Sequence, residues 1–280
     1  MAGDSQTSSY DSALDSLGDW IDASIAEAPN KQLLEQQLQA ISGDEALMHF
    51  LHRFVVFNDA LAARVPFLAG LIHLTPDLFI DLEADQEFCR QVNGRIAAYV
   101  AEAASDEYRM TPDRNLVHQY LSQKFFGGVL RHFQVDGATF DRRHPLPACL
   151  AELLGEARGK FFQQRAPGEI FAALGFHVGL EFFADQEFNL VDQYLRQRYP
   201  ELVAGLEGDG PDRSAYLWLA THTVVEIGHY RAGIAALKAA LTYCYPREQA
   251  PLMLASIKKG FNSFVDLQRR YYESVRLDFA

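Results

Sequence analysis

The chain has 280 residues, of which 49% are hydrophobic and 22% are charged. These proportions are close to those of soluble globular proteins and far from those of disordered or collagen-like chains, so we expect a folded core. The formal net charge of -12 excludes nucleic acid as a favoured partner, because an acidic surface repels phosphates.

The start of the chain lacks the basic and apolar regions of a signal peptide. No apolar run reaches the roughly 18–20 residues that span a bilayer. Cys89, Cys149 and Cys244 are odd in number and lack CxxC spacing, so neither disulfides nor a zinc ribbon is indicated. We therefore expect a cytoplasmic protein with no membrane partner.

Apolar residues recur at helical spacing along nearly the whole chain, and turns rich in Gly and Pro separate the runs. The predicted helices span residues 13–28, 31–41, 44–72, 76–108, 113–134, 146–165, 168–198, 212–243 and 247–277. No linker is long, and no internal repeat is present. The sequence thus predicts an all-α fold with one helical domain at 43–280, after an acidic extension at 1–42 that holds one or two helices.

The predicted helix at 212–243 carries the strongest chemical signal. At 3.6 residues per turn, His222, Glu226 and His229 lie within an arc of about 60° and point the same way. Imidazole and carboxylate at this spacing are ligands that Fe, Mn or Zn accept. A solvated or hydrogen-bonded helix face is the alternative interpretation.

The predicted helix at 168–198 is apolar nearly all round except at His177 and Glu181, which lie one turn apart. A carboxylate among Leu and Phe side chains is costly to bury unless it is paired or bound to a metal. Glu181 therefore needs a partner. His177 is expected to hydrogen-bond to a ligand rather than to be one.

Glu107 ends the predicted helix at 76–108, and His118 lies in the first turns of the next. By themselves these two residues are interpreted as a surface Glu and an ordinary helix His.

Taken in order, these segments resemble the heme-oxygenase-like diiron oxidases, also called iron-containing redox enzymes. The stretch Asp106 to His118 resembles the family's DEYGxGxPxRxxH motif, and Gly175 to Glu181 resembles its GxxxxxE helix. His222 to His229 resembles its HxxxDxxH helix, with Glu226 in place of Asp. The likeness covers roughly residues 45–240. Arg109 and Met110 replace common glycines, and Glu102 is the alternative to Glu107 as the first carboxylate.

The resemblance implies a heme-oxygenase-like helical bundle that binds two non-haem iron ions. It also implies an oxidase or oxygenase that uses O2 as cosubstrate and acts on a small molecule, namely an amino acid, an amine or a fatty acid, in specialised metabolism. A homodimer is left open. The implied iron ligands are Glu107, His118, Glu181, His222, Glu226 and His229.

Three alternatives remain from the sequence. One is a metal-free enzyme on the same fold, similar to thiaminase or pyrroloquinoline-quinone synthase, and another is haem binding through His49 or His52. The third is a non-enzymatic interaction protein that docks through the amphipathic N-terminal helix. Five further histidines show no carboxylate partner at metal-binding spacing and are interpreted as structural, namely His49, His52, His73, His132 and His144.

Overall fold

The computed structural model describes residues 4–62, 64–74, 86–107, 110–111, 114–115, 117–162, 166–208, 215–244 and 247–276. It is a single all-α domain, as predicted, with one short hairpin in the described part. The helices are α1 (Asp4–Glu27), α2 (Asn30–Ala40), α3 (Asp44–Ala62), α4 (Val65–Leu74), α5 (Gln86–Glu107), α6 (His118–His132), α7 (Gly137–Arg143), α8 (Ala148–Phe162), α9 (Pro167–Arg198), α10 (Pro200–Glu207), α11 (Leu217–Thr242) and α12 (Ala250–Arg276), with the 3-10 turn η1 (Arg247–Gln249) before α12. The strands β1 (Met110–Thr111) and β2 (Arg114–Asn115) pair antiparallel.

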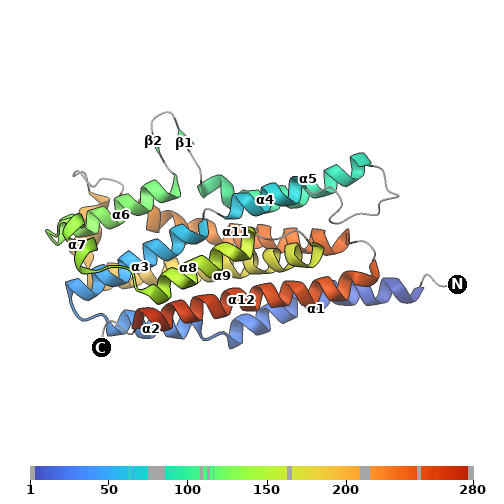
Figure 1. The fold of residues 1–280 in the computed structure, drawn as a ribbon, viewed down its shortest axis with the longest axis horizontal. Helices are drawn as coiled ribbons and strands as arrows, with labels where there is room; N and C mark the ends of the chain where they lie inside the picture. Colours follow the sequence, from blue (N-terminus) through green and yellow to red (C-terminus); the bar gives the residue numbers. More distant parts are fainter. Residues whose placement is uncertain are drawn as a thin grey trace.

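Helix α9 runs through the middle of the elongated bundle (Figure 1). It packs along α12 on one side and along α11 on the other. Helices α1 and α2 lie against α12, while α5 and α6 lie against α11. This order places α9 and α11, which carry most of the predicted ligands, side by side inside the protein.

The backbones of α9 and α12 touch at two glycines. A Cβ atom added at Gly260 would lie 1.8 Å from the carbonyl oxygen of Ala172, and one added at Gly175 would lie 2.1 Å from that of Ile257. Such distances are far inside van der Waals contact, so only a residue without a side chain fits at either position. The two glycines therefore set the spacing between these helices.

The apolar face of α1 is buried within the chain itself. Leu17 and Ile21 are almost fully buried in the main core, and the Trp20 ring packs edge-on against Phe261 of α12 with centroids 5.4 Å apart. The described part of this face is thus covered by α12. The domain boundary between residues 42 and 43 stays a prediction.

Several helix boundaries differ from the predicted ones. The run predicted at 44–72 is divided into α3 and α4, and Pro66 in the first turn of α4 explains the break, since proline lacks the N–H that continues a helix. Helices α7 and α10 were not predicted, because each is too short to show a clear apolar period. The first residues of the helix predicted at 76–108 lie outside the described residues.

One stretch, Asp44–Leu74, is long and apolar enough to cross a membrane by length and composition, although no membrane span was predicted from the sequence. In the protein, 59% of its most apolar window is buried. The core helix of a soluble protein passes the same test, so this finding is weak evidence for a membrane span.

Polar side chains join α2, α9 and α12 inside the core. Asn30 donates hydrogen bonds to the Val265 carbonyl (3.1 Å) and to Gln268 Oε1 (2.8 Å), and Gln268 Nε2 in turn lies 3.4 Å from Glu187 Oε2. Burial raises the pKa of Glu187 to about 8, against the opposing hydrogen bonds from Tyr272, Asn58 and Gln268. Glu187 is therefore mostly protonated at neutral pH.

Glu187→Gln should flatten the pH dependence of stability. A carboxyl group whose pKa is raised in the folded state stabilises that state fully below its unfolded pKa, and this contribution is lost as pH rises towards about 8. The free energy of unfolding of the variant, relative to the native protein, should rise by roughly 1 kcal/mol per pH unit between pH 5 and 8. Urea denaturation at pH 5, 6.5 and 8 measures it, and a constant difference would contradict the shifted pKa.

Candidate metal centre

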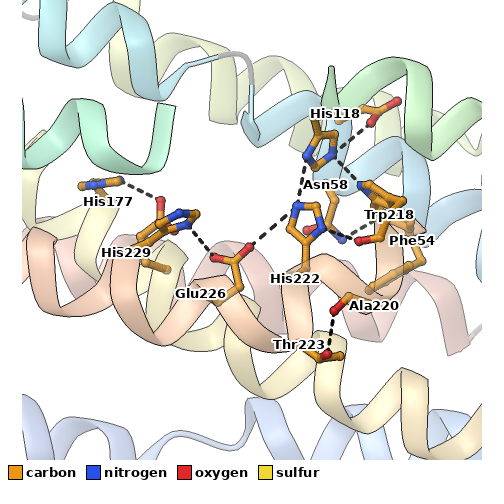
Figure 2. A network of polar contacts seen from close by, with 12 residues as sticks. Phe54, Asn58, His118, His177, Trp218, Ala220, His222, Thr223, Glu226 and His229 are labelled. Atoms are coloured by element: carbon orange, nitrogen blue, oxygen red, sulfur yellow. Dashed lines mark hydrogen bonds and ion pairs between the residues drawn. The ribbon is translucent and has the colours of Figure 1, made fainter. Parts of the chain in front are cut away.

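Three predicted ligands lie on one buried face of α11, as their spacing indicated. His222, Glu226 and His229 are 8%, 4% and 5% exposed. The Glu226 carboxylate lies between the two rings, with Oε1 3.7 Å from His222 Nε2 and Oε2 3.4 Å from His229 Nδ1 (Figure 2). One carboxylate thus faces two imidazoles in opposite directions along the helix.

Helix α9 brings Glu181 to the same point. Its Oε2 atom lies 3.5 Å from His229 Nδ1, and Glu181, Glu226 and His229 each offer a donor atom within 4.8 Å of the others. The other oxygen, Oε1, lies 3.1 Å from Nδ1 of the fully buried His177. Glu181 therefore has the partner that its apolar surroundings demand, and His177 holds its orientation.

His118, the first residue of α6, joins the cluster from the opposite end. Its Nδ1 atom lies 3.2 Å from His222 Nε2 (Figure 2), and its side chain is 7% exposed. A histidine that the sequence alone made unremarkable is therefore in direct contact with the α11 ligands.

Neighbouring groups fix which nitrogen of each ring faces the cluster. His222 Nδ1 donates to the Trp218 carbonyl at 2.6 Å, which leaves the Nε2 lone pair directed at His118 and Glu226. His118 Nε2 accepts a hydrogen bond from Trp218 Nε1 at 3.1 Å and lies 3.3 Å from Asp59 Oδ1. Because Nε2 accepts from the indole, the proton of a neutral His118 ring lies on Nδ1, where it faces the lone pair of His222 Nε2 and where a bound metal ion would displace it.

A small cavity of about 20 Å³ lies beside these donors. Its lining includes His118, Glu181, His222 and Glu226, with apolar atoms from neighbouring residues such as Phe188. The Phe188 ring stacks on His222 with centroids 4.3 Å apart. The space suits an ion or a single water, since one water-sized sphere needs roughly 10–15 Å³.

The buried acids and imidazoles perturb one another strongly. Burial raises the pKa of Glu181, but the imidazoles of His177 and His229 outweigh it and hold that pKa well below its usual range. Burial and the Glu181 charge raise the pKa of Glu226 well above its usual value. Burial lowers the pKa of His229, yet its hydrogen bonds to both carboxylates raise it to about 11. Protons therefore occupy positions that a bound cation would take over.

The donors fall into two groups that share Glu226. His118 Nδ1, His222 Nε2 and Glu226 Oε1 form one group, and His229 Nδ1, Glu226 Oε2 and Glu181 Oε2 form the other. Two donors bound at about 2.1 Å to one transition-metal ion lie roughly 3.0–3.4 Å apart. In the group of Glu181, Glu226 and His229 the observed separations of 3.4 and 3.5 Å are close to that range and all three donors lie within 4.8 Å of one another, so this group fits a metal ion.

Five of the six predicted ligands therefore lie in one buried cluster. The side chain of the sixth, Glu107, lies outside the described residues, and its alternative Glu102 is exposed on α5. Asp59 was not predicted, although an Asn58–Asp59 pair inside the apolar run of α3 was a visible signal. The Asp59 carboxylate also accepts a hydrogen bond from Ser122 Oγ at 2.7 Å.

No family model, no curated protein and no solved structure matches the chain. The chemistry of the site must therefore be inferred from its own residues, which form a buried cluster of carboxylates and histidines able to hold metal ions.

Proposed function

We propose that this protein is a non-haem diiron oxidase or oxygenase, which uses O2 to oxidise a small molecule such as an amino acid, an amine or a fatty acid. The observation that carries the proposal is the position of Glu226 between two groups of donors, each with histidine nitrogen and carboxylate oxygen. The proposal agrees with the resemblance of the ligand order to heme-oxygenase-like diiron enzymes.

The composition of the donor set favours iron. Three imidazoles and two carboxylates are borderline-hard ligands that suit Fe, whereas sites for softer ions usually contain thiolates. Glu226 would serve both positions, His118 and His222 one of them, and Glu181 and His229 the other. Glu107 is the predicted further ligand from the end of α5.

Other residues would orient the ligands and keep water out. Asp59 holds His118 and His177 holds Glu181, which fixes the donor atoms before an ion arrives. Phe188 covers His222 and leaves little room for solvent in the cavity. His229 and Glu226 would give up their protons when an ion binds. Bound iron would supply the redox chemistry with O2 that no side chain in the cluster can provide.

The metal-free alternative related to thiaminase has less support among the described residues. It requires a nucleophilic cysteine beside the cavity. Cys149 is exposed on α8 and Cys244 is buried beyond the end of α11, and neither lines the cavity. The side chain of Cys89 lies outside the described residues.

The proposal predicts two iron ions per chain and a reaction with O2. Protein loaded anaerobically with Fe(II) and desalted should retain about two ions, and mixing with O2 should give a transient visible absorption band whose decay a true substrate accelerates. His222→Ala should lose at least one ion and the O2 reaction, because His222 contacts both His118 and Glu226. Iron analysis and stopped-flow absorption measure both effects.

His132→Ala is the matched control, since His132 is exposed in the last turn of α6. It should keep both iron ions and the O2 reaction. Full iron content in His222→Ala, or a native protein that retains no iron after anaerobic loading, would refute the proposal.

A further inference from the structure

A second group of metal-ligand side chains lies at the other end of α3, where this helix meets the end of α7. Glu45 and His49 are one turn apart on α3, and His144 directly follows the last residue of α7. Their donor atoms all lie within 4.8 Å of one another. His144 Nε2 lies 3.4 Å from Glu45 Oε1, and the His49 and His144 rings meet edge to face with centroids 3.9 Å apart.

We propose that Glu45, His49 and His144 form a surface site for one divalent transition-metal ion of the Zn²⁺ type. Donor atoms at about 2.0–2.1 Å from a tetrahedral zinc ion lie roughly 3.3 Å apart, close to the observed 3.4 Å. Two imidazoles and one carboxylate are ligands that zinc accepts, whereas Ca²⁺ and Mg²⁺ prefer oxygen alone.

The three side chains would supply three ligands of a tetrahedral zinc ion, and the exposure of the site would leave the fourth coordination position to water. Glu45 is 76% exposed at its side chain and His144 is 19% exposed. A surface pocket of about 290 Å³ is lined by Glu45 and His144 together with Asp44, Thr139 and Arg143. The Arg143 charge opposes a weakly bound cation, which further favours an ion that forms strong bonds to imidazole.

The site is separate from the buried centre. About 21 Å of helix separates Glu45 from Asp59, at 1.5 Å per residue. An ion here would join the first two turns of α3 to the C-terminal end of α7, two segments that already meet through the rings of His49 and Phe140 (centroids 5.6 Å apart). Its role would be to fasten these helices together, and the inference does not depend on the proposed diiron function.

Calorimetric titration of chelator-treated full-length protein with Zn²⁺ tests the site. His144→Ala and His49→Ala should each weaken one zinc-binding event roughly tenfold or more, because loss of a ligand costs at least as much as loss of its hydrogen-bond partner. His132→Ala should leave that event unchanged. Added zinc should also raise the melting temperature of the native protein more than that of His144→Ala.

Glu45→Gln provides a variant whose folding is not in question, since it keeps the size of a side chain that lies mostly in solvent. It should weaken the same binding event. Glu181→Gln, which alters the buried centre, should leave this event intact and so distinguishes the two sites. Equal zinc affinity and stoichiometry in the native protein, His144→Ala and Glu45→Gln would overturn the proposal.

Discussion

Gly260→Ala should lower the melting temperature by roughly 5–10 °C. The added Cβ would lie 1.8 Å from the Ala172 carbonyl oxygen, and backbone cannot move aside as a flexible side chain can. Overpacking of a core usually costs about 1–3 kcal/mol, and a backbone clash belongs at or above the upper end of that range. At about 2–4 °C per kcal/mol for a domain of this size, thermal unfolding followed by circular dichroism would detect the loss.

Gly155→Ala is the control on an exposed helix face. A Cβ at Gly155 meets nothing within 4 Å, so the gain in helix propensity, about 1 kcal/mol at most, should leave stability unchanged or slightly higher. Gly175→Ala should behave like Gly260→Ala, because its Cβ would meet the Ile257 carbonyl oxygen. Equal melting temperatures for Gly260→Ala and Gly155→Ala would show that α9 and α12 do not touch through their backbones.

Glu181→Gln should reduce the affinity for one of the two proposed iron ions by roughly 100-fold or more. The change replaces a carboxylate, whose Oε2 lies 3.5 Å from His229 and whose Oε1 lies 3.1 Å from His177, by a neutral amide in a position that is 4% exposed. Loss of a partner that merely orients a ligand costs about 10–100-fold in metal affinity, so loss of the ligand itself should cost more. Competition with a chromophoric chelator under anaerobic conditions measures the affinity.

Glu187→Gln is the matched control for this measurement. Glu187 lies on the same helix and is buried as deeply, but its partners are Gln268, Tyr272 and Asn58 rather than the histidines. Iron affinity should therefore be nearly native in Glu187→Gln. Equal iron affinities in the two variants would remove Glu181 from the ligand set.

Much of the fold follows from patterns that are local in the sequence. The boundaries of α9 were predicted almost to the residue, because Pro167 begins the helix and Pro200 follows its end. The division of the run at 44–72 was missed because apolar spacing continues across Pro66. The backbone contact between α9 and α12 at Gly175 and Gly260 could not be predicted, since it depends on two helices that are far apart in the chain.

In the candidate site, too, the residues that follow a local sequence pattern were predicted from it, and those that depend on distant contacts were not. Helical spacing was enough to place His222, Glu226 and His229 on one face, and the cost of burying a charge was enough to single out Glu181. His118 was recognised only through the resemblance, because no local pattern connects it to α11.

Two features that were not predicted had a recognisable pattern in the sequence. Asp59 was overlooked although it is an acid inside an apolar helix. His49 and His144 were thought to lack a carboxylate partner, and this was wrong, because Glu45 lies one turn before His49 and 3.4 Å from His144. The contacts of His144 with Glu45 and His49 could be seen only in the structure, because they depend on how α7 packs against α3.

The place of Glu226 between two sets of histidines also bears on how the centre would fill. Both metal positions would use the same Glu226 carboxylate, with one proton to lose and one side-chain orientation. The ion that bound first would therefore change the affinity for the second. By thermodynamic reciprocity, binding of the second ion would change the affinity for the first by the same factor. The two ions would then bind cooperatively or anticooperatively rather than independently. Ionisation of Glu226 by the first ion would favour binding of the second, whereas repulsion between two neighbouring dications would oppose it.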